Sequence, residues 1–261
     1  MESQSNRRRP ALQRDACYDF EAVCGSSMNW DHVRENLLAV QERIAVAARR
    51  AGRRAEEITL IAVSKTHPAE AIRAAYEAGV RHFGENRVQE WEGKLGKVAE
   101  LRATWHLIGH LQSNKSARAA KAFACVDSVD DIGLAERLGR AREELGAVEK
   151  LRVLLEVRLA PEETKHGVEI PQLAGLAERV AALPRLHFAG LMCIPPYLDN
   201  IEQLRTYFRK LHELRDDLQK GIGMALPVLS MGMSHDLEAA IAEGATEVRV
   251  GTAIFGTRAL H

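Results

Sequence analysis

Short apolar runs alternate with amphipathic segments along most of the chain. The strand-like runs lie near residues 58–65, 82–85, 105–109, 123–127, 151–159, 186–194, 227–231 and 247–250. Helix-like segments between them include residues 68–79, 113–123, 130–146, 171–183, 201–219 and 234–244. Several begin at Pro, Ser or Asp and end at Gly, as helix termini do. Eight β-α alternations in about 200 residues predict an α/β fold, a parallel sheet closed as a (β/α)8 TIM barrel.

The alternative to a barrel is an open, doubly wound sheet. No G-x-G-x-x-G sequence follows the first predicted strand, as it would in a dinucleotide-binding sheet of that kind. A further helix is predicted before the barrel, because apolar residues recur at helical spacing from Val33 to Ile44. Asp31 can cap the start of this helix, and Gly52 can end it.

The residues before this helix lack its regular pattern of apolar positions. Residues 1–29 carry an Arg cluster, mixed polar residues and no sustained periodicity, and they lack the apolar core of a signal peptide. We interpret them as a disordered extension, with Met28 as an alternative start, and residues 30–261 as one barrel domain.

Charge and cysteine content narrow the class of protein. Lys plus Arg equals Asp plus Glu, 36 of each, so the balance gives no sign of nucleic-acid binding or of an anionic membrane surface. No apolar run approaches the roughly 18 residues of a membrane span. The four cysteines are far apart and form no C-x-x-C pair, which argues against disulfides and zinc. The sequence predicts a reduced, cytoplasmic protein.

A lysine ends the first predicted strand, in the stretch ITLIAVSKTHPAEAI. Side chains alternate along a strand, so Lys65 shares a face with Ile61 and Val63 and would stand at the carboxyl-end rim of the barrel, where active sites lie. Partial desolvation there lowers the pKa of an amine and lets it attack an aldehyde, which predicts a Schiff base. The alternative is a rim lysine that reaches water or pairs with an acid such as Glu85.

The last predicted strand ends in a candidate anion site. Gly251 allows close backbone approach, Thr252 adds a hydroxyl, and the free amides of a starting helix favour an anion. The preceding strand ends in LSMGMSHD, where Ser230 and Ser234 are further donors. Barrels often bind phosphate with the loops after these two strands. An amine beside a phosphate site suits a phosphorylated aldehyde.

Several motifs together carry a family resemblance. The stretches AVSKTHPAEAI, FGENRVQE, WHLIGHLQSNK, GLMCIPP and SMGMSHDLEAAIAEGATEVRVGTAIFGTR resemble the pyridoxal phosphate homeostasis protein family over roughly residues 30–258. The resemblance implies the barrel of the alanine racemase N-terminal domain, without the second, β-rich domain of the racemases. It also implies the cofactor pyridoxal 5'-phosphate.

The same resemblance assigns roles to seven residues. It implies that Lys65 holds pyridoxal phosphate as a Schiff base and that three residues bind its phosphate, namely Ser230, Gly251 and Thr252. By the same matching, Arg249 faces the pyridine nitrogen. Asn86 and Met192 line the pocket.

Arg249 can also be placed from the strand pattern. Glu247, Arg249 and Gly251 share one face, so Arg249 would point into the same barrel mouth as the phosphate loop. A guanidinium has no acceptor and favours an unprotonated pyridine nitrogen, which weakens the ring as an electron sink. The alternative is an outward arginine that pairs with Glu247.

A metal site is not predicted. His106 and His110 are four residues apart on one strand, hence about 13 Å apart at roughly 3.3 Å per residue, and cannot share one ion. Tyr197, Tyr207 and Cys193 are possible acid-base groups that the sequence does not place over the cofactor.

Two functions follow from these observations. The first, which the resemblance implies, is a non-catalytic protein that binds pyridoxal phosphate, maintains its supply and passes it transiently to apo-enzymes; no catalytic residue is assigned, and weak racemase activity is left open. The alternative is an amino-acid racemase, which needs a second base opposite Lys65 and a pocket closed to water. The chain reaches His261 only ten residues after Gly251, too short for the domain that completes racemases. A third class, a Schiff-base aldolase that acts on a sugar phosphate, would share the lysine and the anion loop but should lack the family motifs quoted above. We expect a monomer.

Overall fold

The computed structural model describes residues 30–160 and 166–257. The interpretation of residues 1–29 as a disordered extension lies outside these residues. The strands are β1 (Thr59–Val63), β2 (His82–Glu85), β3 (Thr104–Leu107), β4 (Cys125–Val129), β5 (Leu151–Arg158), β6 (Val168–Glu169), β7 (Leu186–Met192), β8 (Val228–Ser230) and β9 (Glu247–Val250). The helices are α1 (Asp31–Arg50), α2 (Ala69–Glu77), α3 (Val88–Val98), α4 (Ser116–Ala122), α5 (Ile132–Glu144), α6 (Ile170–Ala181), α7 (Ile201–Ile222), α8 (Leu237–Ala242) and α9 (Thr252–Phe255), with short 3-10 turns at Ala55–Glu57 and Ser113–Lys115.

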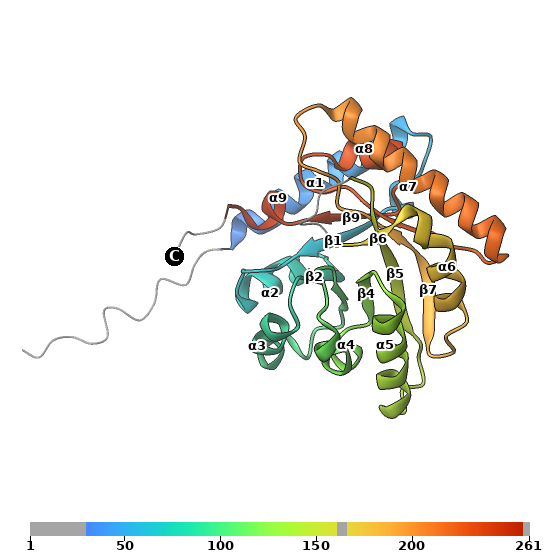
Figure 1. The fold of residues 1–261 in the computed structure, drawn as a ribbon. Helices are drawn as coiled ribbons and strands as arrows, with labels where there is room; N and C mark the ends of the chain where they lie inside the picture. Colours follow the sequence, from blue (N-terminus) through green and yellow to red (C-terminus); the bar gives the residue numbers. More distant parts are fainter. Residues whose placement is uncertain (1–29, 161–165, 258–261) are drawn as a thin grey trace, which may run out of the picture.

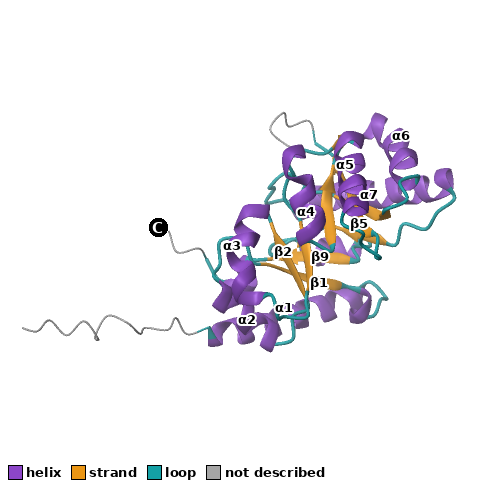
Figure 2. Ribbon diagram, turned by 90° about the horizontal axis from the view of Figure 1, so that it is seen from below, coloured by secondary structure: helices purple, strands orange, loops and turns teal. Residues whose placement is uncertain are grey.

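The sheet closes on itself. Its strands follow the order β4, β3, β2, β1, β9, β8, β7, β5, and β4 also pairs with β5, so the eight form a ring in which every pairing is parallel. The two-residue strand β6 adds to the end of β5. Figures 1 and 2 show the helices arranged around these strands. The predicted barrel is confirmed, and the open sheet is excluded.

Helix α1 packs outside the barrel against α8 and α9, as its apolar face requires. The buried residues run from Val33 to Ala48 at three-to-four spacing, as predicted. Asp31 is the first helical residue and not the cap, since Trp30 occupies that position. Within the described residues, no helix is both long and apolar enough to cross a membrane.

Helix α3 was not among the helices predicted from the sequence. Gly93 and Gly96 interrupt its sequence, and glycine weakens helix propensity. Tertiary packing stabilises it, because the ring of Trp91 lies 3.9 Å, centroid to centroid, from that of Trp105 on β3. This helix brings Glu90 and Lys94 beside the end of β1.

A chain of polar side chains crosses the barrel lumen. His82 Nδ1 lies 3.0 Å from His106 Nε2, and His106 Nδ1 lies 3.0 Å from Asp127 Oδ2. Arg152 Nη2 donates to Asp127 at 3.3 Å, and its Nη1 donates to Glu247 at 2.5 Å. Burial alone would lower the pKa of His106, but the Asp127 carboxylate outweighs it and raises that pKa to about 10. Buried charges of opposite sign therefore alternate across the lumen.

Candidate functional site

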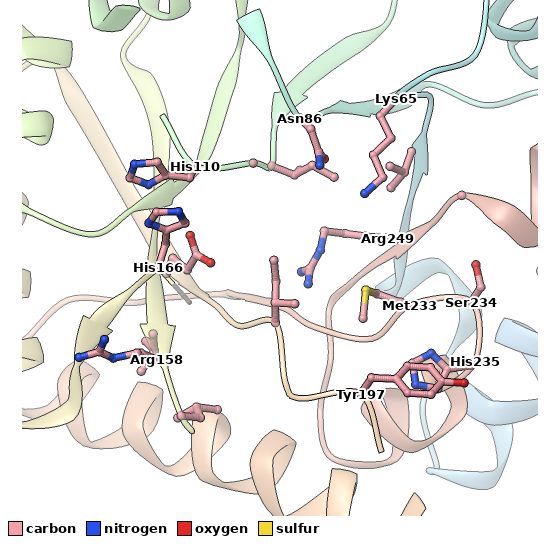
Figure 3. Close-up of a pocket in the computed structure, with 18 of the residues that line it drawn as sticks. Lys65, Asn86, His110, Arg158, His166, Tyr197, Met233, Ser234, His235 and Arg249 are labelled. Carbon is pink, nitrogen blue, oxygen red and sulfur yellow. The ribbon is translucent and has the colours of Figure 1, made fainter. Parts of the chain in front are cut away.

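A cavity of about 480 Å³ opens at the carboxyl ends of the strands. This volume lies within the range of about 300–1,000 Å³ that is usual for small-molecule sites. Residues from several neighbouring strand ends face it: Lys65 follows β1, Asn86 follows β2 and His110 follows β3 (Figure 3). The strand ends therefore build the site at the end of the barrel where the sequence predicted it.

Lys65 follows β1 by two residues and lines the cavity. Its side chain extends into the cavity from the β1 end (Figure 3). Glu85, the acid considered as a salt-bridge partner, accepts hydrogen bonds from Lys94 Nζ at 2.8 Å and from Ser64 Oγ at 2.7 Å. The structure thus brings the predicted amine to the cavity.

Arg249 is buried, with 4% of its surface exposed, and also lines the cavity. Its Nη1 donates to Ser230 Oγ and its Nη2 donates to the Cys193 carbonyl, each at 2.8 Å. Glu247 instead contacts Arg152. The alternative of an outward arginine that pairs with Glu247 is therefore wrong.

The predicted anion loop also reaches the cavity. Gly251, Thr252 and Ser234 all line it. Ser234 Oγ accepts a hydrogen bond from the Ala253 amide at 3.4 Å, which links the loop after β8 to the loop after β9. A Cβ on Gly251 would lie 3.3 Å from the Val63 carbonyl oxygen, so glycine permits the close approach of β9 and β1 here. Two hydroxyl side chains and the main chain of a glycine therefore converge from the ends of the adjacent strands β8 and β9.

Of the three other predicted positions, one lines the cavity and two do not. Asn86 lines the cavity, and its main chain packs so closely that a Cβ on Gly109 would lie 2.5 Å from its carbonyl oxygen. Ser230 and Met192 are fully buried and are not among the residues that line the cavity. They are the last residues of β8 and β7, respectively. The structure therefore brings Ser234, not Ser230, to the anion loop.

The sequence analysis missed Glu156 on β5. Its side chain lines the cavity with 6% of its surface exposed, and among the described residues its Oε2 has no hydrogen-bond partner. Burial, with a smaller contribution from the Asp130 carboxylate, raises the pKa of Glu156 to about 7. A glutamate within the apolar run LLEVRL was the signal that could have identified it.

Two histidines form a second feature that was missed. The rings of His110 and His166 stack 3.6 Å apart and are nearly parallel, at 7°. His110 Nδ1 lies 3.5 Å from Asp130 Oδ2, and ligand atoms of the three residues lie within 4.8 Å of one another. Parallel rings direct their lone pairs side by side, not toward one point, so this arrangement is unsuited to a single ion. The absence of a metal site stays a prediction.

Sequence comparisons place the chain among named relatives. Residues 36–259 match the family described as alanine racemase, N-terminal domain. A pyridoxal phosphate homeostasis protein of Aquifex aeolicus is 47% identical over 224 residues, which cover 86% of this chain and 97% of the relative. A protein of the same name from Pseudomonas aeruginosa is 46% identical over 226 residues, which cover 87% and 96%.

Solved structures agree with the sequence matches. PipY of Synechococcus elongatus with pyridoxal phosphate bound is 39% identical and superposes with a TM-score of 0.77, covering 86% of this chain and all of that one. Alanine racemase of Corynebacterium glutamicum has a TM-score of 0.63 at 16% identity, over 88% of this chain and 62% of its own, and shows the shared fold alone. The chain belongs to the pyridoxal phosphate homeostasis protein family and has the barrel of the alanine racemase N-terminal domain.

Proposed function

We propose that this protein binds pyridoxal 5'-phosphate as a Schiff base on Lys65 and contributes to pyridoxal phosphate homeostasis by holding and releasing it. The observation that carries the proposal is that Lys65 and Thr252 line one cavity from neighbouring strands, since β1 pairs with β9. The relatives' printed name and the ligand in PipY support it.

The residues at the cavity suit the two ends of this ligand. Lys65 would hold the ligand by its aldehyde carbon through the amine, with one water molecule released on binding and taken up again on release. The Thr252 and Ser234 hydroxyls, with the main chain at Gly251, would hold the phosphate. Bound pyridoxal phosphate supplies an electron sink. Arg249 would face the pyridine nitrogen and, having no acceptor, keep it unprotonated.

We further propose that binding, not turnover, is the main role. Racemisation needs a base on the far face of the ligand and exclusion of water. Tyr197 at the cavity is 77% exposed, and His110 and His166 are exposed as well, so these three groups stand in water. An unprotonated pyridine nitrogen also weakens the electron sink. Transient delivery to apo-enzymes, a monomeric state and a cytoplasmic location belong to the same proposal.

The test compares wild type with Lys65→Ala and, as a control, Lys210→Ala, which removes a half-exposed lysine on α7. Pyridoxal phosphate is added, and visible absorption reports the covalent link. We expect wild type and Lys210→Ala to become yellow and Lys65→Ala to stay colourless. Exchange of the α-proton of alanine is then followed in the yellow protein. Efficient exchange would refute the carrier role, and a colourless wild type would refute covalent binding.

A further inference from the structure

The main chain beside Lys65 has an unusual conformation. Thr66 has a φ of 65°, and it is the one non-glycine residue with positive φ among those the structure describes. The left-handed region is unfavourable for a β-branched side chain, and such residues persist only where their surroundings hold them. This conformation sets the direction in which the chain leaves β1, immediately after the lysine that lines the cavity.

Two side chains of α3 hold the peptide groups on either side of Lys65. Lys94 Nζ donates to the Ser64 carbonyl at 2.9 Å, which belongs to the peptide before Lys65. The Glu90 carboxylate accepts a hydrogen bond from the Thr66 amide, which belongs to the peptide after it. Both peptide planes that determine the orientation of Lys65 are therefore attached to one helix.

The two anchors also hold each other. Lys94 Nζ donates to Glu90 Oε1 and to Glu85 Oε1, each at 2.8 Å, in addition to the Ser64 carbonyl. An ammonium group has three hydrogens, so this set uses all of them. The Lys94 side chain is only 11% exposed, and little water competes for these bonds. Lys94 is thus fixed in place.

We infer that Glu90 and Lys94 are positioning residues that clamp the main chain around Lys65 and aim its amine at the aldehyde of the ligand. The inference rests on the proposed function, because it assigns these residues a role in the covalent step. They act through Lys65, since neither lines the cavity that Lys65 faces. Covalent attack depends on angle and distance, whereas binding of the ring and phosphate does not require the amine.

This difference gives the test its readout. Pyridoxine 5'-phosphate carries a hydroxymethyl group in place of the aldehyde, so it occupies the site without bonding to Lys65. Affinities of wild type, Glu90→Met and Lys94→Met for pyridoxal phosphate and for pyridoxine 5'-phosphate are measured by calorimetry. The control is Lys97→Met, the same change at a lysine of α3 whose side chain is 67% exposed.

We expect the two clamp variants to lose about tenfold or more in affinity for pyridoxal phosphate while changing less than about twofold for pyridoxine 5'-phosphate. The control should match wild type with both compounds. Equal losses for both compounds would indicate a merely structural role, and no loss for pyridoxal phosphate would also overturn the inference. A wild type that does not react with pyridoxal phosphate would instead count against the proposed function.

A second variant tests the backbone directly. Glycine occupies the left-handed region readily, so Thr66→Gly removes much of the need for an anchor at that amide. Added to Glu90→Met, it should recover at least part of the lost affinity for pyridoxal phosphate. No recovery in the double variant would contradict the role of Glu90 in holding Thr66. Glu90→Met, at a side chain that is 24% exposed, also keeps the test decisive if Lys94→Met, which leaves Glu85 buried without its cation, fails to fold.

Discussion

Arg249 donates a hydrogen bond from Nη1 to the hydroxyl of Ser230 at 2.8 Å, and both side chains are buried. The second guanidinium bond, to the Cys193 carbonyl, fixes the other end of the same group. Ser230 therefore helps to orient the arginine that lines the cavity. Ser234, four residues later, reaches the cavity beside Thr252.

We predict that the two serines have separable effects. Ser234→Ala should lower the affinity for pyridoxal phosphate and pyridoxine 5'-phosphate alike by about tenfold, because a hydrogen bond to a charged group is lost. Ser230→Ala should change either affinity by less than about threefold while lowering the free energy of unfolding by about 1 kcal/mol, since Arg249 loses an acceptor. Calorimetry and urea titration measure the two quantities. If Ser230→Ala lowered the two affinities more than Ser234→Ala did, Ser230 and not Ser234 would be the serine that binds the phosphate.

The fold could be predicted from sequence because short, mostly buried strand segments alternate along the chain with helices that have a periodic apolar side. The first predicted strand, residues 58–65, contains the observed β1, Thr59–Val63. Lys65 and Gly251 were predictable for a related reason. Both directly follow strand ends, and a closed parallel barrel brings all such ends to one rim.

The rest of the site depends on contacts between distant segments. Strand alternation holds only within a strand, so it could not decide which of Ser230 and Ser234 turns toward the ligand. The neighbours of His110 come from residues 56 and 20 positions away, His166 and Asp130, and no local pattern records that proximity. Glu156 looked like one polar residue in a buried strand.

Glu156 should make stability depend on pH. Its pKa rises from 4.5 to about 7 on folding, so between these values the folded protein binds more protons than the unfolded chain. The free energy of unfolding should therefore fall as pH rises through this range and level off above it. Glu156→Gln should remove the penalty, stabilising by up to about 3 kcal/mol near pH 8 and by much less near pH 5. Urea unfolding at both values measures this; an equal gain at both would contradict it.

His106 should make stability depend on pH in the same direction but in a higher range. Although its burial favours the neutral ring, Asp127 raises its pKa from 6.5 to about 10, so the stabilisation is complete below about pH 6.5 and is lost as pH rises through about 10. His106→Gln should cost about 3 kcal/mol near pH 7 and flatten the dependence between these values. The free energy of unfolding is measured against pH for wild type and for His106→Gln, and the difference between the two profiles removes the contribution of other groups. Parallel profiles would show that His106 is neutral in the folded protein.

Gly190 should tolerate no side chain. It pairs with Val228 across β7 and β8, beside the irregularity where β7 shifts register against β5. A Cβ at Gly190 would lie 1.9 Å from the Val228 carbonyl oxygen, so alanine must force the two strands apart. We expect Gly190→Ala to lower the free energy of unfolding by about 3 kcal/mol or more. Gly175→Ala, in α6 with open space around the new Cβ, should raise it by about 0.5–1 kcal/mol. Urea titration measures the free energy of unfolding of both variants. A Gly190→Ala protein as stable as wild type would mean that β7 and β8 are not packed this closely.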